Sequence, residues 1–90
     1  MDPKALEMMI YVTPKIVGHS ASILADFKLL WSPFRVKGCR LVQTAQGYTV
    51  YFPDRSIKVT QQGMEAIVTA AAGEFERATG RGSRLAAHFV

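Results

Sequence analysis

The chain has 90 residues, enough for one domain with a small hydrophobic core. Apolar residues make up 49% of it, which suffices for folding, yet no apolar run approaches the roughly 18 residues that span a bilayer. The net charge of +4, from 11 Lys and Arg against 7 Asp and Glu, is compatible with a polyanionic partner, and no membrane partner is expected.

Two further features bear on assembly and location. A thin core is often supplemented by a second copy of the chain, so a homodimer is expected. With a single cysteine, Cys39, the chain cannot form an internal disulfide or a cysteine metal cluster. We expect Cys39 to be a small buried residue and the protein to reside in a reducing compartment. The N-terminus lacks the segments of a secretory signal, so the predicted location is cytoplasmic.

Two strands are predicted in the first third of the chain. Residues 8–17 alternate in polarity, and Pro14 places this strand at a sheet edge or a bulge. Its apolar face carries Ile10, Val12 and Ile16. Residues 21–31 predict a second strand that Ser32-Pro33 closes. The inner face of this second strand carries Ile23, Ala25, Phe27, Leu29 and Trp31.

The third run, residues 34–43, changes its alternation at one point. Phe34 and Val36 are even-numbered, whereas Cys39 and Leu41 are odd-numbered. One inserted residue at Lys37-Gly38, a β-bulge, restores a common inner face for all four apolar side chains. The same bulge collects three cations on the opposite face: Arg35, Lys37 and Arg40.

A fourth strand and one helix complete the predicted fold. Residues 48–52 direct Tyr48, Val50 and Phe52 inward and Thr49 and Tyr51 outward. Thr60 is suited to cap a helix that ends near Gly80. Its apolar stripe consists of Met64, Ile67, Val68, Ala71, Phe75 and Ala78. The fold class is therefore α+β: a four-stranded antiparallel sheet followed by one C-terminal amphipathic helix, with a single domain over 1–80 and a basic tail over 81–90.

Catalysis requires positioned pairs of reactive groups, and the sequence offers few candidates. His19 falls in a predicted turn and His88 near the C-terminus, and neither lies near a nucleophile or a second metal ligand. Glu65, Glu74 and Glu76 are expected on the solvated side of the helix. We therefore expect no enzyme, cofactor, metal or small-molecule substrate.

The face of the sheet opposite the helix, here called the outer face, carries the main functional signal. Cations neutralise phosphates, and exposed rings offer stacking surfaces to unpaired bases. The strand assignment gathers there Tyr11, Lys15, Lys28, Arg35, Lys37, Arg40, Thr49 and Tyr51. This pattern favours nucleic-acid binding. The alternative is a solvated face whose charges keep the protein soluble while its tyrosines fill a dimer contact.

The segment from about Leu24 to Phe75 resembles the SpoVG (stage V sporulation protein G, or septation protein) family of small bacterial regulators. ILADFKL is similar to the family's second strand, and FRVKGCRLVQ to its Phe-Val-Val-His-Asp-Ile-Arg-Val-Ile segment. GYTVYFP resembles its Gly-Leu-Phe-Val-Ala-Met-Pro stretch, and VTQQGMEAIVTAA its helix. Of the basic loop that family members carry before the helix, only Arg55 remains. The resemblance implies a dimer that binds DNA or RNA and influences gene expression.

The resulting hypothesis is a dimeric, cytoplasmic nucleic-acid-binding regulator without covalent chemistry. Its predicted phosphate contacts are Lys28, Arg35, Lys37, Arg40 and Arg55, with base stacking on Tyr51. The alternative is a homo-oligomeric protein-interaction module that binds no nucleic acid. Such a module would dock a protein partner through the same face or through the tail at Phe89.

Overall fold

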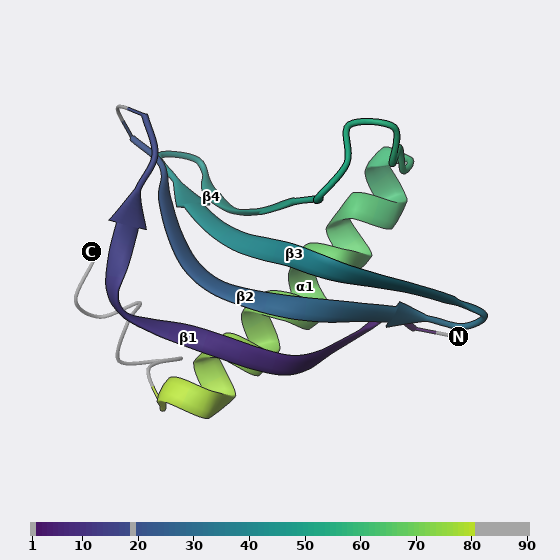
Figure 1. Cartoon of the computed structure of the whole chain (residues 1–90), viewed down its shortest axis with the longest axis horizontal. Coiled ribbons are helices and arrows are strands. Elements are labelled where there is room, and N and C mark those ends of the chain that lie inside the picture. Colours follow the sequence, from purple (N-terminus) through teal and green to yellow (C-terminus); the bar gives the residue numbers. More distant parts are fainter. Residues whose placement is uncertain (1, 19, 81–90) are drawn as a thin grey trace.

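A computed structural model describes residues 2–18 and 20–80 of the chain. Four strands form one antiparallel sheet in the order β1-β2-β3-β4, and a single helix follows them (Figure 1). The elements are β1 (Lys4–Ile16), β2 (Ser22–Trp31), β3 (Phe34–Thr44), β4 (Gly47–Tyr51) and α1 (Gln61–Thr79). The predicted fold class is confirmed.

The helix packs against one face of the sheet, which we call the inner face, and the core lies between them (Figure 1). From α1 the predicted stripe buries Ile67, Ala71 and Phe75. The sheet contributes Phe27, Leu29, Cys39, Leu41 and Val50 among others. No helix or strand of residues 2–18 and 20–80 covers the outer face. The outer face is exposed around Leu6, Arg35 and Lys37, whereas Val42 on the same face is buried.

Both predicted ends of the helix are confirmed. The backbone N–H of Gly63 donates to the Thr60 hydroxyl over 3.0 Å, so Thr60 satisfies one of the unpaired donors of the first turn. At the other end Gly80 has φ +66°, and its N–H donates to the carbonyl of Glu76. This left-handed cap is a conformation that glycine adopts without steric cost.

The predicted bulge in β3 is also confirmed. Phe27 pairs with Cys39 and Leu29 with Val36, so both Lys37 and Gly38 lie opposite the single residue between Phe27 and Leu29. Gly38 has φ +80°, which an L-residue rarely adopts. The extra residue returns Val36 and Cys39 to a common inner face and directs Lys37 outward.

Phe34 was expected in the core, and this expectation is wrong. Its side chain lies on the inner side of β3, yet the residue is 71% exposed. The turn between β2 and β3 extends beyond the end of α1, so the helix does not reach this position (Figure 1). Phe34 instead lies at the margin of a shallow apolar hollow of about 340 Å³ that Trp31, Phe52 and Val59 also line.

The predicted apolar face of β1 is wrong beyond Ile10. Ile10 pairs with Ala25, and the next pair joins Lys15 to Ile23, so residues 11–14 lie opposite one residue of β2. This irregularity ends the alternation, and Val12 and Ile16 are exposed. The prediction for Pro14 is confirmed, because β1 is an edge strand and Pro14 lies in its irregular segment.

A bulge in β2 exchanges two residues between the faces. Ile23 pairs with Val42 and Ala25 with Leu41, which leaves Leu24 as an extra residue. Because neighbours in a strand point to opposite faces, Ile23 lies with Val42 on the side opposite Leu41. Ile23 is therefore buried, at 1% exposed, but not on the expected inner face, and Leu24 belongs to the core cluster under the helix.

Candidate nucleic-acid interface

Strand register arranges the outer face in three rows that run across the sheet. Each row mixes apolar and cationic side chains. The first contains Lys4, Leu30 and Arg35, the second Leu6, Lys28 and the bulged Lys37, and the third Met9, Asp26, Arg40 and Tyr51. Together the rows hold five cations and two carboxylates, the latter from Asp26 and the bulged Glu7 of β1. The outer face is therefore positively charged.

Asp26 organises the third row through both oxygens of its carboxylate. The hydroxyl of Tyr11 donates to Oδ2 over 3.0 Å, and Nε of Arg40 lies 3.6 Å from Oδ1. The hydrogen bond to Asp26 is the largest cause that raises the pKa of Tyr11 above its usual value. Arg40 is thus held beside Tyr51, its register partner in β4, which is 45% exposed.

Glu7 and Lys28 form the second ion pair of the face. Their Oε2 and Nζ atoms lie 2.9 Å apart. The hydrogen bond and the charge of Lys28 lower the pKa of Glu7, and the charge of Lys37 contributes in the same direction. Glu7 itself has φ +50° and lies at a register shift between Leu6 and Met9. Part of the Lys28 charge is therefore already compensated.

Arg35 and Lys37 differ from these paired cations. Both are exposed, and neither forms an ion pair with any residue that the structure describes. They line a hollow of about 330 Å³ in the outer face, together with Leu6, Glu7, Lys28 and Leu30. We call this concavity the outer hollow. Arg35 and Lys37 therefore offer this hollow two cations that form no ion pair with a described carboxylate.

The structure brings together five of the six predicted site residues. Lys28, Arg35, Lys37, Arg40 and Tyr51 all lie on the outer face. Arg55 does not join them, because it is exposed in the loop of residues 52–60 that connects β4 to α1. The absence of Arg55 from the sheet follows from its position after the end of β4 at Tyr51.

Sequence reasoning missed Lys4, Leu6 and Met9. It began the first strand at residue 8, whereas β1 begins at Lys4. Because of the register shift after Leu6, the inward-facing residues of β1 are odd-numbered up to Ala5 and even-numbered from Met8. No glycine or proline marks this shift, so simple alternation had no signal by which to extend the strand.

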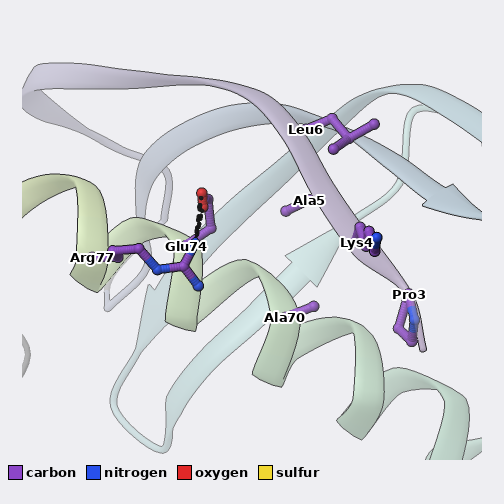
Figure 2. A pocket seen from close by; sticks show the side chains of 7 residues that line it. All are labelled: Pro3, Lys4, Ala5, Leu6, Ala70, Glu74 and Arg77. Atoms are coloured by element: carbon purple, nitrogen blue, oxygen red, sulfur yellow. Dashed lines mark hydrogen bonds and ion pairs between the residues drawn. The ribbon is translucent and has the colours of Figure 1, made fainter.

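A second concavity lies on the other side of β1, between that strand and α1, with a volume of about 370 Å³ (Figure 2). Its lining includes Ala5, Ala70, Glu74 and Arg77. Two cations, Lys4 and Arg77, line this groove, and the Arg77 guanidinium is paired with Glu74, with Nη1 and Oε2 3.0 Å apart. An anionic ligand would be attracted less strongly here than at the outer hollow.

Other kinds of site find no support within the described part of the chain. Residues 2–18 and 20–80 contain no group of three or more His, Cys, Asp or Glu side chains that could hold a metal ion. Nor does any described helix have the length and apolar character needed to cross a membrane. Both histidines, His19 and His88, lie outside the described residues, as does the tail 81–90.

No family model matches this chain, and no curated protein or solved structure is significantly similar to it. The resemblance to SpoVG proteins therefore stays a prediction from the quoted sequence segments.

Proposed function

We propose that this chain is a dimeric nucleic-acid-binding protein of the bacterial cytoplasm that regulates gene expression, as the resemblance to SpoVG implies. The proposal rests on two cations of the outer face that form no ion pair with any described residue. Arg35 and Lys37 are exposed beside the paired Lys28 and Arg40, on a face that no described helix covers. Such a surface attracts phosphates and releases the counterions bound to them.

The binding mechanism is electrostatic, with a stacking contribution from Tyr51. Arg40 and Tyr51 are register partners, which places a guanidinium and an exposed ring next to each other. A base can stack on this ring while the adjacent cation contacts its phosphate. The helix is a poorer surface for phosphate, because α1 carries three carboxylates and one cation.

The test is a titration of labelled DNA and RNA oligonucleotides over a salt series. We expect the double variant R35A/K37A to bind all sequences more weakly and to lower the slope of log affinity against log salt by about two. The double variant K58A/R77A removes the same charge from the loop and the helix, so it should lower the slope much less. Equal slopes for the two variants would show that the outer face is not the site.

Arg55 needs its own variant, because it lies away from the sheet. R55A tests whether the loop before α1 adds a phosphate contact. A contact would lower the salt slope by about one.

Dimer formation is supported by the apolar hollow near the β2–β3 turn. Phe34 is 71% and Val59 39% exposed, and both line this concavity. In a two-fold dimer each copy could place its Phe34 in the hollow of the other copy, because such an interface uses the same patch on both subunits. The same hollow favours the second candidate function, a homo-oligomeric protein-interaction module. That candidate predicts dimers that bind neither DNA nor RNA.

A further inference from the structure

We propose that the outer hollow seats one unpaired nucleotide, so that the preferred ligand of this protein is a single strand and not a duplex. The inference deepens the proposed function and depends on it. It names the form of nucleic acid that the outer face selects and the place where one nucleotide is held.

The outer hollow combines the two surfaces that a nucleotide requires. Leu6, which is 39% exposed, and Leu30 supply apolar surface for the flat face of a base. Arg35 and Lys37 supply cations for the adjoining phosphate. In Figure 2 the Leu6 side chain points away from α1, toward the outer face. With about 330 Å³, the hollow falls at the small end of the range for small-ligand sites.

Two irregularities on either side of β2 create this concavity. In β1, Glu7 and Met8 lie opposite Phe27 alone, because the register shifts between Leu6 and Met9. In β3, Lys37 and Gly38 lie opposite the position of Lys28. Bulges redirect side chains and occur more often than average next to functional sites. The strand pairing is therefore irregular in β1 and in β3, on both sides of Lys28, and the outer hollow lies there.

Glu7 determines which side of the hollow receives the phosphate. Its carboxylate holds Lys28 by the 2.9 Å ion pair and keeps a negative charge at that side. Arg35 and Lys37, both in β3, have no such partner among the described residues. The phosphate is consequently expected on the β3 side, with the base toward Leu6 in β1.

A duplex does not fit this arrangement. Its bases are paired and stacked, so none can enter a hollow unless it is first turned out of the helix. Proteins that read intact duplexes commonly insert a helix into the major groove. Here the apolar stripe of α1 is buried against the sheet, and its polar side carries more carboxylates than cations. A duplex could therefore contact only the cations of the outer face.

The experiment compares a labelled single strand of about 12 nucleotides, as DNA and as RNA, with the same DNA strand annealed to its complement. All three probes are measured by fluorescence anisotropy at one salt concentration. We expect the single strands to bind at least about tenfold more tightly than the duplex, since only they offer an unpaired base.

Two variants in the same strand locate the nucleotide. L6E introduces a carboxylate at the outer hollow, and we expect it to weaken single-strand binding by at least about tenfold. V12E makes the same chemical change at a fully exposed residue that does not line the hollow, so its effect should stay within about twofold. L6Q, which adds no charge, should weaken single-strand binding less than L6E. Thermal melting of each variant shows whether the fold is retained.

The outcomes separate this inference from the proposed function. If neither single strands nor duplex bind, the proposed function fails and the inference fails with it. If the duplex binds as tightly as the single strands, or if L6E and V12E weaken binding equally, the inference is overturned while nucleic-acid binding stands. Selective loss with L6E and a preference for single strands would support both.

Discussion

The carboxylate of Glu7 faces the ammonium of Lys28 across β1 and β2, with 2.9 Å between Oε2 and Nζ. The pairing lowers the pKa of Glu7 from its ordinary value of 4.5, so the carboxylate stays charged throughout the physiological pH range. Lys28 thus meets a phosphate only in competition with an internal partner. Glu7 therefore lowers the affinity of the outer face for polyanions.

Removal of the charge at Glu7 should strengthen binding. We expect E7Q to bind oligonucleotides about threefold more tightly at low salt, because it frees Lys28 and removes a repulsive charge. The gain should be the same at pH 6 and pH 8, since the lowered pKa leaves Glu7 ionised at both values. E65Q removes an equal charge from the exposed side of α1 and serves as the control. Identical gains for the two variants would assign the effect to net charge alone.

Gly38 and Gly73 should respond in opposite directions to the same substitution. Gly38 has φ +80°, so G38A strains the backbone even though its Cβ would lie in ordinary contact, 3.4 Å from the Cβ of Pro53. We expect a loss of about 1–2 kcal/mol in the free energy of unfolding. Gly73 lies within α1 with open space around it, and G73A should add about 0.5–1 kcal/mol. Urea denaturation measures both values.

A stabilising G38A variant would contradict the bulge geometry. The bulge also positions Lys37, so G38A should weaken oligonucleotide binding in addition to stability. G73A should leave binding unchanged, because Gly73 belongs to the helix behind the sheet.

Cys39 should react with thiol reagents only after unfolding. The residue is buried, and burial is the main cause that raises its pKa to about 11. The folded state therefore holds the thiol proton more tightly than the unfolded state, in which the pKa is about 8.5. The contribution to stability is complete below pH 8.5 or so and decreases as the pH rises toward about 11.

This pH dependence can be isolated with the variant C39A. Over that window the parent should lose about 2–3 kcal/mol more of its free energy of unfolding than C39A, which has no thiol to ionise. Rapid labelling of the native protein at pH 8 would show instead that Cys39 is accessible.

The comparison of β2 and β3 shows what the sequence could and could not predict about the fold. The bulge in β3 was predictable because the apolar positions change from even to odd around a glycine, Gly38. The bulge in β2 was not, because Ile23 and Leu24 are both apolar and either could occupy the inner face. Contacts with the neighbouring strands decide between them, and these contacts are nonlocal.

The same distinction applies to the candidate site. The cations of β2 and β3 were predicted on the outer face because they follow the alternation of strongly apolar runs. The outer hollow was not predicted, since it also requires the register shift at Glu7 in β1. A residue with φ +50° that is neither glycine nor asparagine leaves no mark in the sequence.

Phe34 should control the oligomeric state. Light scattering of the parent is expected to give about twice the chain mass of 9.9 kDa, because a second copy can cover the apolar hollow. F34S should shift the protein toward monomers without a large loss of stability, as the side chain is 71% exposed. V12S alters another exposed apolar residue away from that hollow and should remain dimeric. A monomeric parent at micromolar concentration would refute the dimer.

Tyr51 and Lys37 should leave different signatures in binding, because one stacks on bases and the other neutralises phosphate. Y51A is expected to weaken single-strand binding by about 1–3 kcal/mol with an unchanged salt slope, since stacking releases no counterions. K37A is expected to lower that slope by about one. Y51F keeps an aromatic ring at the position that pairs with Arg40, so this variant should bind as the parent does. If Y51A lowers the salt slope, or if Y51F binds as weakly as Y51A, Tyr51 acts through its hydroxyl or through the charges around it, and the stacking role is wrong.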